Sequence, residues 1–260
     1  MIKKLTKFFF TTLLIYSYSI NAQQTSDFET WNALGVQKKL FDNNLTLSLS
    51  EEFRLNNNST TMDQFFTEFG IKYKFLKHWT IGAGYRSIRE NEGDDESNSK
   101  KNRWNTDLGF KHKIDRFTLG YRLRYQSKSE SGISKEDGDI PIQKLRTILK
   151  VNYNIKNWKW DPYVATELFW TKQKINVDNY ISSINEEDIE IAGMQKIRLS
   201  IGTSKKIKKI GQLNLFYRFE HEFNKYPYSY IEMSDWSTQS HGPIDMKNWH
   251  IIGINFNFKL

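Results

Sequence analysis

The stretch LTLSLSEEFRL, residues 45–55, alternates apolar and polar side chains almost without interruption. Its apolar members share one face of an extended strand: Leu45, Leu47, Leu49, Phe53 and Leu55. Glu51 is the exception, because it lies on that apolar face. Strands in soluble sheets typically have about five or six residues, whereas a tilted strand needs about 9–11 residues to cross a bilayer. The stretch therefore predicts a β-strand that spans a membrane.

The same alternation recurs along the chain, at residues 65–75, 79–86, 103–114, 117–125, 145–155, 163–170, 196–201, 212–223 and 252–260. A soluble β-sandwich also alternates, but its strands are shorter. Strands in lipid cannot leave an edge unpaired, so the sheet must close on itself. We therefore expect an all-β fold, a transmembrane antiparallel up-and-down β-barrel of about 10–12 strands.

The number of strands depends on one further segment. Residues Trp31–Leu40 alternate as well, with Leu34 and Val36 against Ala33 and Gly35. Counting this segment gives eleven strands and a parallel first and last strand, whereas bacterial single-chain barrels have an even number. Either the segment lies in the lumen or the periplasm and ten strands span, or one connection contains a further strand.

The composition excludes several classes of protein. The 260-residue chain is 15% aromatic and 26% charged, and a mean hydropathy of −0.67 excludes a bundle of transmembrane helices. Without cysteine it can form no disulfide, thiol nucleophile or cysteine-ligated zinc site. The net charge of +8 is interleaved along strands instead of forming one patch, so no nucleic-acid partner is expected. No glycine-rich phosphate loop or metal-ligand spacing appears in the sequence, and no cofactor or metal is expected.

The N-terminus is typical of an exported protein. Lys3, Lys4 and Lys7 precede an apolar stretch over Phe8–Ile20, and Ile20-Asn21-Ala22 fits a cleavage site. A single membrane anchor is the alternative, but the apolar stretch is short for a span. We therefore expect a signal peptide at residues 1–22 and a single outer-membrane β-barrel domain at residues 23–260, located in the outer membrane of a Gram-negative bacterium.

Connection lengths predict the orientation of the barrel. Short connections at 41–44, 76–78, 115–116, 156–159 and 205–209 alternate with longer ones at 56–61, 90–101, 127–142, 174–190 and 224–248. Outer-membrane barrels have short periplasmic turns and long external loops, so the short set is expected in the periplasm. Three of the long connections carry acidic clusters, at 92–96, 136–139 and 186–188. These are either solvated loops or sites for cations that bridge lipopolysaccharide, and outer-membrane lipid and lipopolysaccharide are the expected surroundings.

The faces opposite the apolar ones carry many charges, which the alternation directs into the lumen: Glu52, Arg54, Glu68, Lys72, Arg86, Asp107, Arg122, Arg124, Arg146, Glu167, Arg198, Arg218 and Glu220. One interpretation is a network of ion pairs that fills a narrow barrel, because isolated charges in a space of low dielectric are costly. The other is a narrow, porin-like pore that favours anions, since basic residues outnumber acidic ones. The function expected is structural, or that of a narrow solute or ion pore.

The last strand carries a candidate assembly signal. Gly253, Phe256 and Phe258 have the spacing Gly-x-x-aromatic-x-aromatic, which resembles the C-terminal signal read by the barrel-assembly machinery. The match is partial, because Ile251 replaces a polar residue and the sequence ends in Leu260. Simple anchoring of these side chains at the membrane interface is the alternative. The barrel-assembly machinery is therefore an expected partner, and the sequence does not define an oligomeric state.

An enzyme is the alternative from a different functional class. An outer-membrane lipase or deacylase acting at the barrel rim would need a serine and a histidine within hydrogen-bond reach. His221 and His250 lie near the expected external rim, but no serine lies two residues from either on the same strand face. No catalytic residue is therefore assigned, and a non-enzymatic protein is expected.

Several short motifs carry a resemblance to a known family. In chain order they are Trp31…Gly35, Glu51-Glu52-Phe53-Arg54, Gly84-Tyr85-Arg86, Pro162-Tyr163, Glu167-Leu168-Phe169 and Arg198. Together they resemble the family catalogued as domain of unknown function 2490, whose members resemble predicted outer-membrane β-barrels of Gram-negative bacteria. The resemblance covers most of the chain after residue 22. It implies the barrel fold and the outer-membrane location, and it implies no catalytic residues.

Overall fold

The computed structural model describes residues 26–91, 99–133, 141–175, 189–223 and 248–260. These residues form the strands β1 (Ser26–Leu40), β2 (Leu45–Asn56), β3 (Thr61–Lys74), β4 (Trp79–Glu90), β5 (Ser99–Ile114), β6 (Phe117–Glu130), β7 (Ile142–Tyr153), β8 (Asp161–Ile175), β9 (Ile189–Ile207), β10 (Gly211–Glu222) and β11 (Asn248–Lys259). The expected signal peptide and the three acidic clusters lie outside the described residues. Within them, no helix has the length and apolar character needed to cross a membrane.

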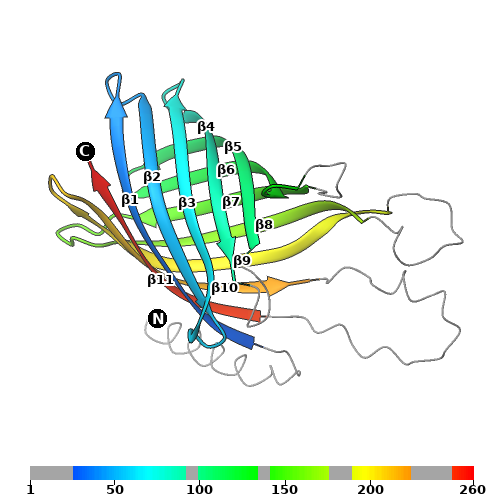
Figure 1. Ribbon diagram of the computed structural model, residues 1–260. Coiled ribbons are helices and arrows are strands. Elements are labelled where there is room, and N and C mark those ends of the chain that lie inside the picture. The colour runs from blue at the N-terminus through cyan, green and yellow to red at the C-terminus, as the bar shows by residue number, and fades with distance from the viewer. Residues whose placement is uncertain (1–25, 92–98, 134–140, 176–188, 224–247) are drawn as a thin grey trace, which may run out of the picture.

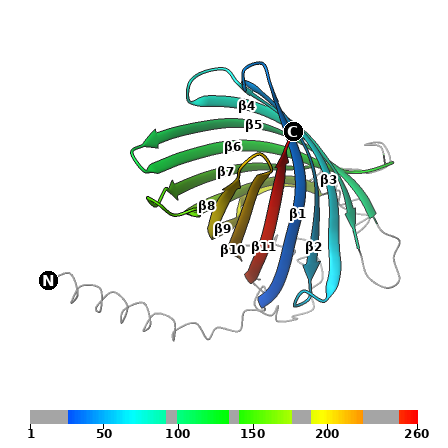
Figure 2. The same ribbon diagram turned by 90° about the vertical axis from the view of Figure 1, so that its left-hand side faces the viewer.

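The strands form one closed barrel, as Figures 1 and 2 show. Each strand pairs antiparallel with its neighbours in the sequence, and β1 closes the sheet by pairing with β11. Every long strand edge therefore has a partner, which removes the unpaired backbone groups of an open sheet. The predicted closed β-barrel is confirmed.

The closing pair corrects one expectation. The segment around Trp31–Leu40 lies neither in the lumen nor outside the barrel: it is part of β1, which pairs with β2 on one side and with β11 on the other. The described residues thus form an eleven-stranded barrel. An odd number of up-and-down strands leaves the first and last running the same way, and β1 and β11 are accordingly parallel, from Ser26 beside Asn248 to Gln37 beside Lys259.

The barrel has two different rims. Residues 41–44, 75–78, 115–116, 154–160 and 208–210 connect strands at one rim, which we call the short-turn rim. Lys259 ends β11 at this rim, where the amide of Leu260 donates to the carbonyl of Gln37. Ser26 begins β1 at the opposite rim, where β2, β4, β6, β8 and β10 end (Figure 1).

The two faces of the sheet have inverted polarity relative to a soluble protein. Large apolar side chains are exposed on the outside, with 63% of Trp104, 59% of Leu34 and 57% of Ile201 accessible. Inside, charged side chains are covered, and Glu167 and Glu220 retain 6% and 3% of their surface. Charged residues are almost never fully buried unless they are paired, so the interior must satisfy its own charges.

Apolar side chains also point inward on one side of the barrel. Trp31, Tyr163, Phe216 and Ile251 pack together there, with Trp249 against them. Gly253 makes this packing possible, because a Cβ at that position would collide with the carbonyl oxygen of Trp31 and the ring of Phe216. The parallel junction of β1 with β11 is therefore braced from inside the lumen.

Candidate functional site: the charged lumen

A cavity of about 1290 Å³ occupies the barrel interior, and every inward-facing charged residue predicted from the sequence lines it. Asn43 and Asn44 line it near the short-turn rim, and Gln64 and Glu90 line it near the opposite rim. These charged side chains therefore lie on the lumen-facing side of their strands.

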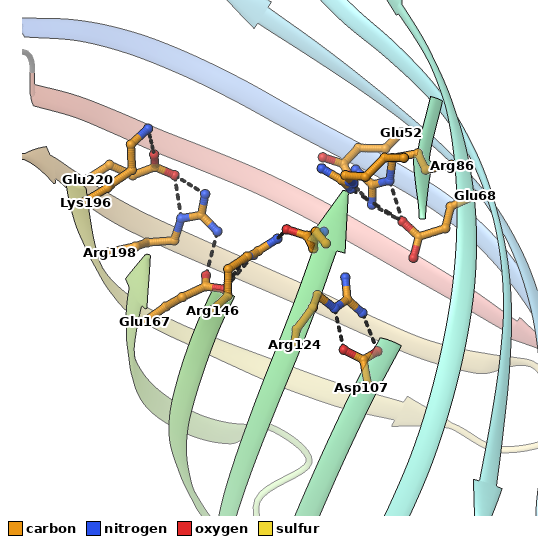
Figure 3. A network of polar contacts seen from close by, with 12 residues as sticks. Glu52, Glu68, Arg86, Asp107, Arg124, Arg146, Glu167, Lys196, Arg198 and Glu220 are labelled. Carbon is orange, nitrogen blue, oxygen red and sulfur yellow. Dashed lines mark hydrogen bonds and ion pairs between the residues drawn. The ribbon is translucent and has the colours of Figure 1, made fainter. Parts of the chain in front are cut away.

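One chain of ion pairs crosses four neighbouring strands (Figure 3). The carboxylate of Glu167 on β8 accepts from Arg146 Nη2 on β7 at 2.5 Å and from Arg198 Nη1 on β9 at 2.7 Å. Arg198 Nε also donates to Glu220 on β10 at 2.5 Å, and Lys196 Nζ lies 3.0 Å from the second oxygen of Glu220. Charge-assisted hydrogen bonds of this kind are about twice as strong as neutral ones, so these strands are fixed to one another from within.

A second group of ion pairs lies on β2, β3, β4 and β5. Arg86 donates to Glu68 on the adjacent strand, and its Nη2 lies 3.7 Å from Glu52, two strands away. Arg54 Nε donates to Glu52 at 2.7 Å, and Arg103 approaches Glu68 at 3.9 Å. The pair between Arg86 and Glu52 passes over β3, so this group projects into the lumen instead of following its wall.

Between the two groups, Arg124 on β6 forms a two-pronged contact with Asp107 on β5. Nε lies 2.5 Å from one carboxylate oxygen and Nη2 lies 2.7 Å from the other. We call the whole set the ion-pair belt: Glu52, Arg54, Glu68, Arg86, Asp107, Arg124, Arg146, Glu167, Lys196, Arg198 and Glu220.

Aromatic rings connect parts of the belt that lie on distant strands. The guanidinium carbon of Arg54 lies 3.5 Å from the ring centre of Trp31, and those of Arg198 and Arg218 lie at 5.1 and 5.3 Å. These arginines come from β2, β9 and β10, on both sides of β1. Phe169 lies 4.8 Å from both Arg146 and Arg198. Cation–π contacts within about 6 Å are attractive and strengthen when desolvated, so Trp31 is a hub inside the lumen.

Phe66 has the same role in the second group, and sequence reasoning missed it. Its ring centre lies 4.6 Å from both Arg54 and Arg86, and its side chain is buried. The doublet Phe65-Phe66 places one ring on each face of β3, so alternation alone did not distinguish the ring with arginine neighbours. The signal was its parity with Glu68, the inward residue two positions later.

Arg122 and Arg218 line the cavity but do not join the belt. In the described part of the chain, no carboxylate lies within ion-pair distance of either guanidinium. Nε of Arg122 is buried and has no hydrogen-bond partner among the described atoms. Arg218 instead stacks on Phe216, with its guanidinium carbon 3.8 Å from the ring centre.

The candidate assembly signal lies on β11. Phe258 is partly exposed and pairs with Val36 of β1, and the rings of Phe256 and Phe258 meet edge to face at 4.5 Å between centres. Gly253 lies at the internal packing described above. These aromatic side chains are therefore accessible near the short-turn rim.

The two rim histidines have polar partners that are not serine. Nδ1 of His250 lies 2.7 Å from the hydroxyl of Tyr217, and Nδ1 of His221 lies 2.8 Å from Oδ1 of Asn248. In the ranges that the structure describes, no group of three or more metal-binding side chains gathers.

The short motifs behind the sequence resemblance converge in space. They contribute to the belt and its aromatic hub from separate strands: Trp31, Glu52, Arg54, Arg86, Glu167, Phe169 and Arg198. A family model described as "Protein of unknown function (DUF2490)" matches residues 28–228. No curated protein matches the chain.

Proposed function

This chain belongs to the DUF2490 family, whose function is unknown, and we propose that it is an outer-membrane β-barrel of a Gram-negative bacterium with a constricted lumen. In this proposal the protein has no enzymatic activity. Its role is structural, or that of a narrow pore at most.

The inverted polarity of the sheet supports the membrane location. The outer face exposes many large apolar side chains, among them Leu34, Trp104 and Ile201, and exposed apolar patches of a soluble monomer are normally small. Burying such a surface in lipid stabilises the protein by about 25 cal/mol per Å². In water the same surface would drive aggregation.

The belt supports a constricted lumen, and this observation carries the proposal. Trp31 gathers arginines from β2, β9 and β10, and Arg86 reaches past β3 to Glu52. Side chains that meet across several strands occupy the space that a wide pore would need. Small barrels generally have interiors filled by side chains.

The enzyme alternative gains no support from the rim histidines, whose partners are Tyr217 and Asn248. A hydrolase of the serine type needs its nucleophile within hydrogen-bond reach of the base. We therefore keep the non-enzymatic proposal.

Membrane fractionation and planar-bilayer recording test this proposal together. We expect the full-length protein in the outer-membrane fraction, with a gel mobility that changes on boiling because a closed barrel resists detergent until heated. Unmodified protein should give little conductance. Trp31→Ala should raise conductance because it removes the hub, and Trp104→Ala, which truncates an exposed outer ring, serves as the matched control.

Two results would contradict the proposal separately. Recovery as a soluble periplasmic protein would contradict the membrane location. Large, steady, anion-selective channels from the unmodified protein would contradict the constriction and favour an open pore.

A further inference from the structure

Between the belt and the short-turn rim, the wall of the lumen changes character. Lys72, Lys111 and Lys150 lie two or three residues from the short-turn ends of β3, β5 and β7 and line the cavity. Arg122 and Arg218 line it next to the belt, five and seven residues from the short-turn ends of β6 and β10. We call these five residues and the space between them the basic chamber.

Small residues leave room in this part of the barrel. Gly82, Gly109, Gly120 and Ala165 line the cavity on β4, β5, β6 and β8. Lys72 points inward and is nevertheless exposed, so it faces open space. Ligand pockets typically enclose about 300–1000 Å³, and the whole cavity of about 1290 Å³ is large enough to include one.

Among the described residues, no carboxylate lies within ion-pair distance of any cation of the chamber, although belt carboxylates act at longer range on Arg122 and Arg218. Every carboxylate that lines the cavity lies six or more residues from the short-turn end of its strand, in the belt or beyond it. Asp107 is close enough to act on Lys72 and Arg122, but both of its oxygens are taken by Arg124.

The cations of the chamber lie within electrostatic range of one another. The ammonium group of Lys150 is repelled by the positive charges of Lys111, Arg122 and Arg218. The ammonium group of Lys72 is repelled by those of Lys111 and Arg122. Like charges held together by low-dielectric walls focus a positive potential and concentrate anions. The belt pairs its charges directly, whereas the three lysines of the basic chamber have no ion-pair partner among the described residues and Lys150 is surrounded by other cations.

The remaining wall supplies neutral hydrogen-bonding groups. Amide side chains line the cavity on the neighbouring strands: Asn152, Gln212, Asn214, Asn255 and Asn257. Lys150 is itself held in place, with its Nζ 3.4 Å from the ring centre of Tyr163. Amides donate and accept hydrogen bonds, so the chamber can orient a polar molecule as well as attract it.

We propose that the basic chamber binds a small, hydrophilic anion carrying two or more negative charges, which enters from the short-turn rim. Guanidinium groups bind phosphate and carboxylate oxygens in pairs, and ammonium groups add point charges. The belt lies above the chamber and stops the ligand from continuing through the barrel. The membrane location proposed above determines only that this rim faces the periplasm; the binding itself does not depend on it.

Calorimetric titration of the full-length barrel in neutral detergent micelles tests this inference. Pyrophosphate and citrate are the probes, and about 150 mM NaCl screens exposed charges over distances beyond roughly 8 Å. We expect saturable binding of at least one probe. Lys150→Gln and Lys72→Gln should each weaken it about tenfold, the loss typical of one hydrogen bond to a charged group.

The matched control is Lys100→Gln, which removes the same charge from an exposed position on β5 near the opposite rim. Its dissociation constant should equal that of the unmodified protein. Heat-dependent gel mobility shows that each variant is folded. Binding of pyrophosphate alone would identify phosphoryl groups as the ligand chemistry, and binding of both probes would identify charge as the main criterion.

The inference would be overturned if neither probe bound at millimolar concentration, or if Lys100→Gln weakened binding as much as Lys150→Gln. These results are independent of the conductance and fractionation experiments. A barrel that binds no anion can still be a constricted outer-membrane protein, and a barrel that conducts can still bind one.

Discussion

Two arginines that are neighbours on the inner face of β6 should respond to the same substitution in opposite ways. Arg124 contacts both oxygens of Asp107, whereas Arg122 has no carboxylate within ion-pair distance among the described residues. Methionine is a suitable replacement because its unbranched apolar chain keeps the packing of the arginine stem. Alternation in the sequence places both arginines in the lumen without distinguishing them, whereas the structure pairs only Arg124 with a carboxylate.

The magnitude follows from the geometry of each site. The side chains of Arg124 and Asp107 retain only 11% and 13% of their exposure, so solvent screens this pair little. Unit charges about 4 Å apart attract by about 4 kcal/mol at an effective dielectric constant of 20, and breaking a buried pair typically costs about 3–5 kcal/mol. We therefore expect Arg124→Met to lower the free energy of unfolding by about 3–5 kcal/mol.

Arg122→Met should change the free energy of unfolding by less than about 1 kcal/mol, with any change towards higher stability. The substitution removes a buried Nε that has no hydrogen-bond partner among the described atoms, together with a cation that neighbours Arg124 and forms no ion pair there. A buried polar group without a partner costs about 1–3 kcal/mol, and its removal offsets the lost packing.

Urea unfolding in lipid vesicles, followed by tryptophan fluorescence, measures both effects. Gel mobility with and without boiling confirms the folded fraction at each point. Equal losses for the two variants would refute the reasoning, because they would mean that the chain does not distinguish a paired from an unpaired lumen arginine. A loss above about 3 kcal/mol for Arg122→Met would refute it as well.

Three further substitutions test other features. Glu51→Gln should raise the free energy of unfolding in lipid vesicles by up to about 2 kcal/mol and change it little in detergent. The reason is that Glu51 lies on the outer face, where Thr67 is its hydrogen-bond partner. Equal effects in both media would argue against lipid contact. Gly253→Val should lower the free energy of unfolding by about 1–3 kcal/mol or prevent closure, since the added atoms meet Trp31 and Phe216; unchanged urea unfolding would show that the packing can yield. Phe258→Leu should refold normally into detergent yet accumulate unassembled in the periplasm if the terminal aromatic residue is an assembly signal; normal assembly in cells would leave it as an interfacial anchor.

Side-chain alternation was sufficient to predict the strands and their faces. Residues 45–55 became β2 nearly to the residue, and the charged residues that the alternation directs into the lumen, from Glu52 to Glu220, line the cavity. This succeeded because the period of two residues is a local property, set by the geometry of a single extended chain. Glu51 broke the pattern, and the structure supplies Thr67 as its partner across the strands.

The way in which the barrel closes was not predictable, because the pairing of its first and last strands depends on residues far apart in the sequence. Alternation over Trp31–Leu40 is the same for a strand in the wall and for one in the lumen. Only the ladder with Asn248–Lys259 separates the two. The contact of Arg86 with Glu52 likewise depends on the stagger of three strands.

A β-bulge interrupts the alternation of side chains at one point on β9. The register shifts opposite Phe169 and Trp170, and consecutive residues Gln195 and Lys196 both line the cavity. A bulge inserts one residue without a partner and so inverts the pattern beyond it. Lys196, which pairs with Glu220, lies on the polar face that the alternation over 196–201 indicated, but it was not included among the charged lumen residues predicted from the sequence.

The parallel junction of β1 and β11 separates the two ends of the barrel. Ser26 lies at one rim and Lys259 at the other, and the fifteen residues of β1 span about 50 Å along the strand. Circular permutation is tolerated where chain ends lie close together. Here a linker between the ends would have to follow the outer wall or thread the lumen past Trp31. Peptide tags placed before Ser26 and after Lys259 would consequently emerge on opposite sides of any membrane that the barrel spans, and paired tags would report its orientation in a single labelling experiment.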